Sequence, residues 1–319
     1  MMKKEVAKNT YSLPRSSVLS VRTFKKNWEL LLLAMPAIIY FIVFCYAPMG
    51  GAVIAFKYYN YIDGIFGSRW VGFDNFKYFF LSNDAWRITR NTLLYNAAFI
   101  CLDTIVGVAL ALLLYEVKSR KCIKYYQTTM ILPHFLSWVI IGYISYALLN
   151  PSYGLLNQVI GAFGGEGIDW YATQGAWPFI LVIFQIWQCI GLKNIMFYAS
   201  VMGIDQSLFE AAKIDGANKW QQIKYITLPH LVSIITILTI LAIGGIFRGD
   251  FGLFYQIPRD VGLLYPVTDV IDTYIYRGMK NGDIGVTSAV GLFQSFVGMV
   301  LVLLTNAVVK KINPDHALF

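Results

Sequence analysis

The chain carries long apolar runs separated by short polar segments. Runs of about 20 residues with few or no charges have the length that a helix needs to cross a bilayer. They predict six membrane-spanning helices, at about residues 29–48, 91–114, 130–149, 177–199, 229–249 and 286–308. The third helix could start earlier or be followed by a re-entrant segment, because residues 125–165 contain no charged side chain. The pattern indicates an all-α membrane protein.

Lys and Arg residues concentrate in alternate segments between these helices. Four segments together hold 16 of them: 1–27, 115–130, 201–228 and 309–319. The three intervening segments hold only 8 over more residues: 49–90, 150–176 and 250–285. Because cytoplasmic loops are enriched in Lys and Arg, we expect both termini and the loop at 201–228 to be cytoplasmic.

This orientation divides the chain into successive parts. The uncharged run from Leu30 to Phe56 is longer than the apolar core of a signal peptide, so we expect it to remain as an anchor. The expected parts are a basic cytoplasmic N-terminus (1–27), a first transmembrane helix (28–49), an extracellular loop (50–90), a core of five helices (91–308) and a cytoplasmic tail (309–319).

Composition supports the membrane assignment and narrows the chemistry. Hydrophobic residues make up 57% of the 319 residues and charged residues 14%, which is too apolar for an ordinary soluble enzyme. The net charge of +8 is a topology signal and not a sign of nucleic-acid binding. Four scattered Cys and three His predict no metal site. The chain lacks a phosphate-binding loop and the common hydrolase motifs, so any ATP hydrolysis must belong to another chain.

The cytoplasmic loop at 201–229 carries strong local signals. Ser207 and Glu210 have the spacing of a capping box at a helix start, and Gly216 is suited to end that helix in a left-handed conformation. Asn218 and Gln221 form a second possible box. We therefore expect two short helices bent at Gly216.

The same loop resembles a known signature. Glu210-Ala211-Ala212, Gly216 and Ile226-Thr227-Leu228-Pro229 are similar to the E-A-A-x3-G-x9-I-x-L-P motif in membrane subunits of bacterial ABC importers. Residues 210–217 resemble the carbohydrate branch of that family. Further segments resemble its polysaccharide-type permeases: 48–50, 55–57, 70–76, 91–93 and 268–274.

The resemblance implies a type I importer permease that transports carbohydrate across the bacterial cytoplasmic membrane by alternating access, with oligosaccharides as the expected substrates. It implies a coupling role toward an ATPase for six loop residues: Glu210, Ala211, Ala212, Asp215, Gly216 and Ala217. The implied partners are a second homologous permease, two cytoplasmic ATPase subunits and an extracellular sugar-binding protein, with a homodimer as the lesser option. ATP and magnesium would be held by the ATPase, and this chain would bind no cofactor.

Asp103 lies midway along the second predicted helix, where an unpaired carboxylate is costly. Asn96, Asp103 and Gly107 share one helix face, so Asp103 requires either a partner or a cavity, and both remain open. Lys193 is near the cytoplasmic end of the fourth helix, where we expect it to reach the headgroups.

Sugars bind through planar hydrogen bonds and aromatic stacking. With Asp103, the candidates for the substrate pathway are therefore Trp138, Gln185, Trp187, Gln188, Arg248 and Asp250. Packing is an alternative for the aromatic residues, and a local salt bridge is one for Arg248 and Asp250.

Two other functions stay open on the sequence. An ion-gradient-driven transporter would place acidic groups at the membrane midplane, for which Asp103 is the one candidate. A membrane sensor or regulator would use the same loop to bind an ATPase without passing substrate.

Overall fold

The computed structural model describes residues 27–312, so the predicted N-terminal segment 1–26 and the end of the tail, 313–319, lie outside it. The chain divides after Ala52 into two units. In the first, α2 (Trp28–Phe41), a π-helical turn (Ile42–Tyr46) and α3 (Ala47–Met49) form one helical run. The run continues as a 3₁₀-helix to Phe56, and so passes the predicted end at 48–49.

The second unit opens with a small ordered lobe within the predicted extracellular loop. Strands β1 (Lys57–Tyr58) and β2 (Arg69–Trp70) pair antiparallel around α4 (Gly64–Gly67), and α5 (Asp74–Leu81) follows. The amide of Asn75 on α5 donates to the carbonyls of Ala55 and Lys57, both at 2.9 Å. These bonds satisfy one carbonyl of the 3₁₀-helix and one of β1, and they tie both to α5.

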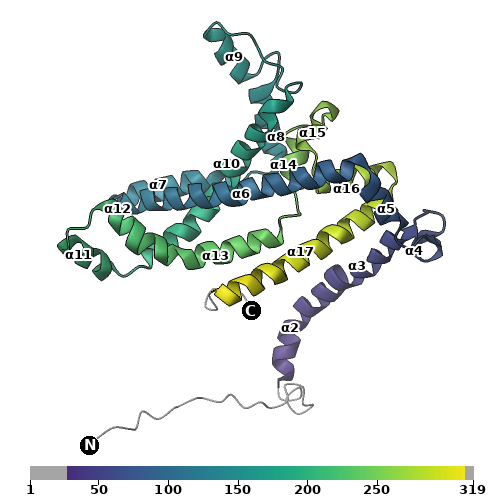
Figure 1. Cartoon of the computed structure of the whole chain (residues 1–319), viewed down its shortest axis with the longest axis horizontal. Coiled ribbons are helices and arrows are strands. Elements are labelled where there is room, and N and C mark those ends of the chain that lie inside the picture. The colour runs from purple at the N-terminus through teal and green to yellow at the C-terminus, as the bar shows by residue number, and fades with distance from the viewer. Residues whose placement is uncertain (1–26, 313–319) are drawn as a thin grey trace, which may run out of the picture. The chain divides into compact units, whose positions relative to one another are not determined.

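Four long helices dominate this unit in Figure 1: α6 (Asn83–Glu116), α10 (Trp177–Met202), α13 (Leu228–Gly244) and α17 (Ile284–Ile312). Helix α6 begins at Asn83, eight residues before the predicted start at 91, with the Ser82 side chain as its cap. Its 34 residues span about 50 Å at 1.5 Å per residue, more than the hydrocarbon thickness. Hydropathy therefore missed an end that lies beyond the apolar layer and carries charges.

The prediction of one helix over residues 130–149 is wrong. Helix α7 (Arg120–Ile131) and helix α8 (Trp138–Leu149) are bent by 98° at a short break that includes a 3₁₀ turn at Leu132–Phe135. Pro133 lies in that turn, and Ser137 caps α8 by accepting from the Ile140 backbone N–H at 3.4 Å. The described residues therefore contain five helices long and apolar enough to span a membrane, or six if this bent pair counts as one span. The predicted all-α membrane fold is confirmed.

The fifth predicted helix, 229–249, is displaced at both ends. Helix α12 (Lys219–Gln222) runs through a π turn (Ile223–Thr227) directly into α13, so Pro229 lies within a continuous helix. Proline cannot donate the usual backbone hydrogen bond, and the wider π turn just before it absorbs this irregularity. Helix α13 ends at Gly244, and residues beyond it leave the helical conformation.

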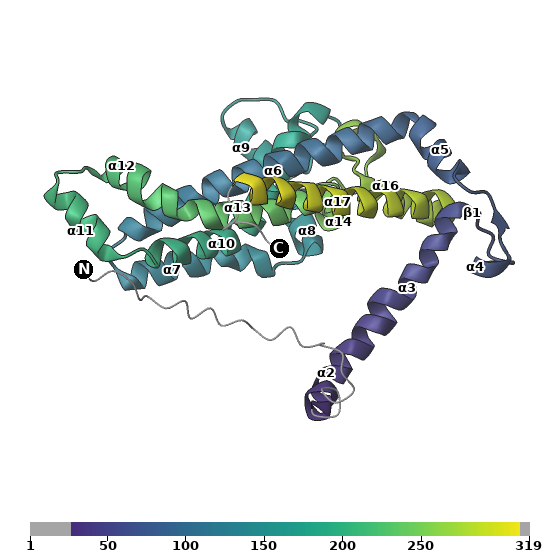
Figure 2. The same cartoon turned by 60° about the horizontal axis from the view of Figure 1, so that its bottom comes forward.

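Shorter elements complete the unit. They are α9 (Leu155–Ala162), α11 (Gln206–Ile214), α14 (Phe251–Gln256), α15 (Tyr265–Thr268), α16 (Ile271–Asn281) and the 3₁₀ turns Gln174–Ala176 and Gly262–Leu264. In Figures 1 and 2, α11 and α12 lie together at one end of the unit, and α5 and α16 lie toward the other.

Helix α6 packs along α10, and α13 packs along α17. A Cβ on Gly107 of α6 would lie 2.9 Å from the Phe197 ring of α10. A Cβ on Gly191 of α10 would lie 2.1 Å from the backbone oxygen of Met130 at the end of α7. Because lipid is as apolar as the side chains, close packing at small residues is a main source of helix association in membranes.

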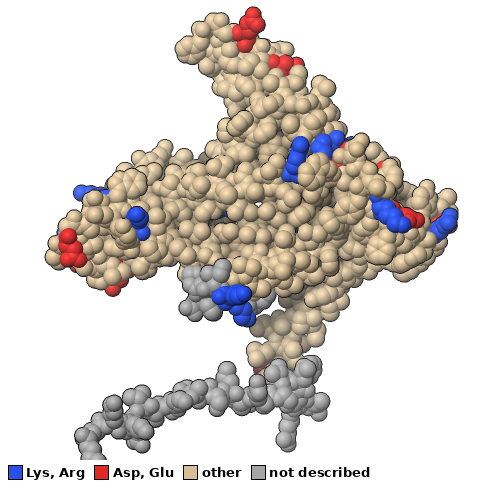
Figure 3. Space-filling model, in the orientation of Figure 1, with Lys and Arg blue, Asp and Glu red and all other residues tan. Residues whose placement is uncertain are grey.

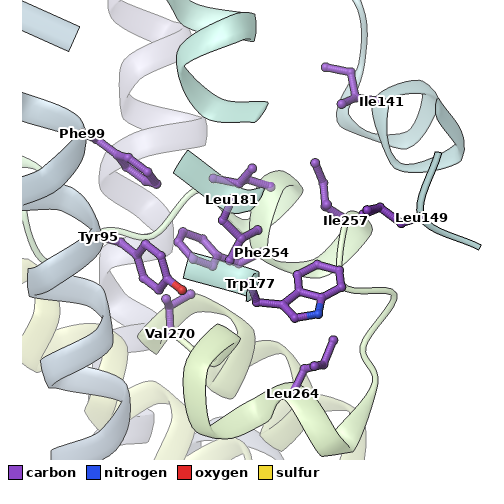
Figure 4. Close-up of a cluster of buried hydrophobic side chains, with 11 residues drawn as sticks. Tyr95, Phe99, Ile141, Leu149, Trp177, Leu181, Phe254, Ile257, Leu264 and Val270 are labelled. Carbon is purple, nitrogen blue, oxygen red and sulfur yellow. The ribbon is translucent and has the colours of Figure 1, made fainter. Parts of the chain in front are cut away.

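The largest apolar cluster joins four helices near one end of this packing (Figure 4). Tyr95 and Phe99 of α6 contact Phe254 of α14, while Trp177 begins α10 and is fully buried. Ile141 and Leu149 extend the cluster to α8, as Figure 4 shows. The cluster thus fixes α8 and α14 against the α6–α10 pair.

Charged side chains are few on the surface over the long helices of this unit. On the face in Figure 3 they lie over the loop containing α11 and α12, near α5 and α16, over the region of α9 and at the end of α17. The surface over the long helices between them is largely uncharged, as the hydrocarbon layer requires.

Replacing Gly191 tests the close approach of α10 to α7. We expect Gly191→Ala to destabilise the protein by about 1–3 kcal/mol, because the added methyl group meets backbone atoms that cannot rotate away. Thermal unfolding in detergent measures the effect. Gly161→Ala on α9 is the control, since its Cβ would meet nothing within 4 Å; equal stability of both variants would contradict the packing.

Candidate coupling and pathway sites

The loop at 201–229 forms the two predicted short helices, but the first one begins differently. The cap of α11 is Asp205, whose carboxylate accepts from the Ser207 backbone N–H at 2.9 Å. This bond holds the pKa of Asp205 below its ordinary value. The expected box between Ser207 and Glu210 is wrong, because Ser207 already lies inside the helix.

The predicted bend at Gly216 is confirmed. Its φ of 77° is left-handed, and the Ala217 N–H donates back to the Ala212 carbonyl at 2.8 Å. This pattern closes α11 with a Schellman-type cap. Asn218 and Gln221 then form the predicted capping box at the start of α12.

Both short helices are fixed to the end of α6. The Phe209 ring is buried and lies 5.7 Å from the Tyr115 ring, and the Gln206 amide donates to the Tyr115 hydroxyl at 2.9 Å. Lys219 of α12 pairs with Glu116 at 2.7 Å. Tyr115, Glu116 and Lys219 carry no signal in the sequence, because no local pattern links positions about a hundred residues apart.

The opposite surface of α11 is open. Glu210, Ala211 and Asp215 are exposed, while Ala212 and Ala217 are half-buried. Ile214 is 87% exposed, although it is a large apolar residue next to the cap. The loop therefore has one surface fixed to its own chain and a second surface that combines a carboxylate with small and apolar side chains.

Asp103 is buried between helices and has a partner. Its carboxylate forms an ion pair with Lys193 of α10 and accepts from the Gln185 amide at 3.2 Å. The expectation that Lys193 reaches the headgroups is therefore wrong, because the buried carboxylate on α6 offers it a stronger partner. Of the two roles left open for Asp103, the structure supports the structural pair.

Trp138 and Asp250 also come together. The indole N–H of Trp138 donates to the Asp250 carboxylate at 2.8 Å, and the other oxygen caps α14 by accepting from Leu253 N–H at 3.2 Å. The Trp138 ring lies over Gly252, where a Cβ would be 2.1 Å from it. Asp250 thus joins α8 to α14 and forms no salt bridge with Arg248.

The remaining pathway candidates stand apart from these groups. Gln188 is buried and accepts from the neighbouring Cys189 thiol at 2.9 Å, while Trp187 is 40% exposed. Arg248 has an exposed side chain and lies beyond the end of α13. Its carbonyl accepts from the Asn96 amide at 3.0 Å. These residues do not form one pocket within this unit.

A buried charge network, absent from the predictions, joins the start of α6 to α16. The Asp269 side chain is fully buried between Arg87 and Arg277, at 3.2 and 2.5 Å. The Asn91 amide donates to the Asp269 carbonyl at 3.0 Å. Arg87 also pairs with Asp84 at 2.8 Å and Arg277 with Asp260 at 3.3 Å, so two cations share three carboxylates here. The predicted extracellular end of α6 is therefore anchored as well as its other end.

In residues 27–312, no group of three or more His, Cys, Asp and Glu side chains is placed to hold a metal ion. The recognisable parts of this arrangement are polar pairs that join helices and an exposed loop surface.

Comparison with known proteins identifies the family. Residues 91–315 match the family described as binding-protein-dependent transport system inner membrane component. The chain is 37% identical to the polygalacturonan/rhamnogalacturonan transport system permease protein YteP of Bacillus subtilis, over 90% of this chain and 89% of that protein.

The fold agrees with solved transporters. The chain is similar to a subunit in the crystal structure of a bacterial ABC transporter that imports the acidic polysaccharide alginate, with a TM-score of 0.84 and 32% identity over 92% of this chain and 98% of that one. It is equally similar to a chain of the alginate transporter in complex with an alginate pentasaccharide-bound periplasmic protein, with a TM-score of 0.83, 32% identity and coverage of 91% and 97%. This chain belongs to the binding-protein-dependent transport system inner membrane component family, the membrane permease subunits of ABC importers.

Proposed function

We propose that this chain forms half of the translocation pathway of an ATP-driven importer for oligosaccharides. One observation carries the proposal: α11 is fixed to α6 on one surface and presents Glu210, Ala211 and Ile214 on the other. A loop built in this way transmits a push from a docked protein to the long helices. The names of the relatives, which concern polygalacturonan, rhamnogalacturonan and alginate, support a carbohydrate substrate.

The coupling runs through defined contacts. A cytoplasmic ATPase would bind the open surface of α11, with Glu210 facing a basic residue and Ile214 entering an apolar cleft. Closure of the ATPase would move α11 and α12 together, because Gly216 joins them through a closed cap. Tyr115 and Glu116 would pass this movement to α6, and the continuous helix from Lys219 to Gly244 would pass it to α13.

The partners follow from this arrangement. We infer a second, homologous permease that completes the pathway, two ATPase subunits that hold ATP and magnesium, and an extracellular sugar-binding protein. The relative solved with its periplasmic protein supports the last of these. Both termini would be cytoplasmic, in agreement with the excess of Lys and Arg in the segments on that side.

The structure weakens one of the two alternative functions, and uptake measurements test the other. An ion-gradient-driven transporter needs a carboxylate available for proton or cation exchange, whereas Asp103 is engaged by Lys193 and Gln185. A sensor that binds an ATPase without passing substrate would leave sugar uptake intact when it is deleted.

Glu210→Ala tests the coupling surface. In proteoliposomes that contain the presumed permease, ATPase and sugar-binding protein, we expect sugar-stimulated ATP hydrolysis to fall about tenfold or more, because an ion pair with the ATPase loses one partner. Copurification of the ATPase shows whether the complex still assembles. The control is Glu166→Ala, which removes an exposed carboxylate in the predicted extracellular segment and should leave the ATP hydrolysis of the complex unchanged. Wild-type rates of hydrolysis in both variants would show that Glu210 has no role in coupling.

Gly216→Ala tests the bend. A side chain at φ 77° costs about 1 kcal/mol, so α11 should change its angle or lose its last turn. We expect a lower ratio of sugar uptake to ATP hydrolysed, measured in the same vesicles. Gly203→Ala in the same loop is the control, since its Cβ would be 3.4 Å from its nearest neighbour at an ordinary φ. Identical ratios for both variants would argue against a coupled bend.

Asp103→Asn and Lys193→Gln separate a structural pair from a proton relay. Lys193→Gln leaves the buried Asp103 carboxylate unpaired and should cost about 3–5 kcal/mol in unfolding free energy. Asp103→Asn should cost less, because the Lys193 side chain is 37% exposed, and the double variant should recover most of the larger loss. Thermal unfolding and ATP-driven uptake are measured together. A stable double variant that has lost all uptake would show that the pair acts in transport and not only in packing.

A further inference from the structure

The connection after α14 contains two consecutive strained residues. Arg259 and Asp260 have φ values of 59° and 52°, and they are the only described non-glycine residues with positive φ. Glycine adopts this conformation without strain, and arginine does not. Strain of this kind persists where the surrounding structure enforces it, and it clusters at binding sites. The contacts of the Arg259 and Asp260 side chains should therefore explain why the strained backbone is kept.

Asp260 shows how the turn is enforced. Its carboxylate accepts from the Tyr265 hydroxyl at 3.0 Å and from Arg277 at 3.3 Å, so it is held toward α16. Arg259 contacts α8 instead. Its guanidinium carbon lies 4.1 Å from the Tyr146 ring centroid and 6.0 Å from that of Tyr143. The strained pair thus directs one side chain to each neighbouring helix.

Arg277 provides an internal comparison for Arg259. Its guanidinium carbon also lies 4.1 Å from an aromatic centroid, that of Tyr265, and it pairs with the carboxylates of Asp260 and Asp269. Arg259 has the same stacking geometry but forms no ion pair with any Asp or Glu between residues 27 and 312. A guanidinium stacked on a ring keeps its N–H edge available for a carboxylate.

A cavity of about 210 Å³ lies beside this group. Its lining includes Tyr143, Tyr255, Gln256 and Asp260 in addition to Arg259, and the Asp260 carboxylate is already paired with Arg277. The Tyr143 side chain is 66% exposed and offers an aromatic face, while Gln256 offers an amide. Aromatic faces, planar amides and a guanidinium edge are together the groups that bind a sugar ring carrying a carboxylate.

The cavity lies next to predicted pathway residues. Val139 and Gly142 of α8 line it, one and four residues after Trp138, which is bonded to Asp250. A Cβ on Gly142 would lie 2.9 Å from the Gln256 backbone oxygen, so α8 and α14 approach closely at its floor. A charged Arg259 is unfavourable against lipid tails, which favours a position facing water or protein.

We propose that Arg259 binds the carboxylate of an acidic sugar unit, such as a uronate, as the oligosaccharide enters the pathway. This inference rests on the proposed function and names its substrate class. Tyr146 holds the guanidinium by stacking, and Tyr143 contacts the apolar face of the ring. The carboxylate of the substrate occupies the place that Asp260 and Asp269 occupy for Arg277.

The experiment uses the full complex in proteoliposomes and compares a tri-galacturonate with its carboxyl-reduced, neutral form. Arg259→Gln should lower uptake of the acidic sugar about tenfold relative to the neutral one, because a charge-assisted, bidentate contact is lost. Arg259→Lys keeps the positive charge but not the bidentate guanidinium geometry, so its uptake of the acidic sugar should lie between those of the wild type and Arg259→Gln. Lys280→Gln, an exposed cation on α16, should leave uptake unchanged.

Arg259→Gly separates binding from folding. Glycine adopts the φ of 59° without strain, so this variant should unfold at the same or a higher temperature than the wild type and still lose the preference for the acidic sugar. Undiminished uptake of the acidic sugar by both variants would overturn the inference. An equal loss of uptake for the acidic and the neutral sugar would also overturn it. Failure of the variant complexes to assemble would do the same, since Arg259 would then contact a partner chain. A wild-type complex in which no sugar stimulates ATP hydrolysis would instead overturn the proposed function itself.

Discussion

The pairing of α6 with α10 is the constraint on which the rest of the second unit depends. A bilayer gives helices no hydrophobic reason to associate, so the two must be joined by close contact and by polar groups that would be costly alone. Gly107 provides the contact by admitting the Phe197 ring, and Asp103 provides the polar link through Lys193. Neither feature is stable without its partner on the other helix.

Helix α6 also carries the connections at both ends of the unit. At one end Tyr115 and Glu116 hold the short helices of the loop, and at the other Arg87 and Asn91 hold the segment around Asp269. Both connections combine a charge with additional hydrogen bonds or aromatic contact. A movement imposed on the loop is therefore transmitted to a stiff helix that is anchored at its far end as well.

The strained turn at Arg259 is also connected to α6. Asp260 is held by Arg277, which is held by the buried Asp269, and Asp269 pairs with Arg87 of α6. The position of Arg259 against α8 is thus connected, through three ion pairs, to the helix that also carries the loop. This connection gives a physical route by which substrate contact and loop movement could influence each other, without a contact between the two sites.

The sequence by itself determined the all-α membrane class, the number of apolar segments, the bend at Gly216 and the cap at Asn218, because these depend on residues close together in the chain. It misplaced helix ends where a helix extends past its apolar span, as at Asn83, or breaks within an uncharged stretch, as at Pro133. Only the tertiary structure decided the partner of Asp103, the anchoring of the loop on α6 and the place of Arg259 on α8. Each of these joins residues about 90 or more positions apart, and no local pattern specifies which distant side chain neutralises a charge.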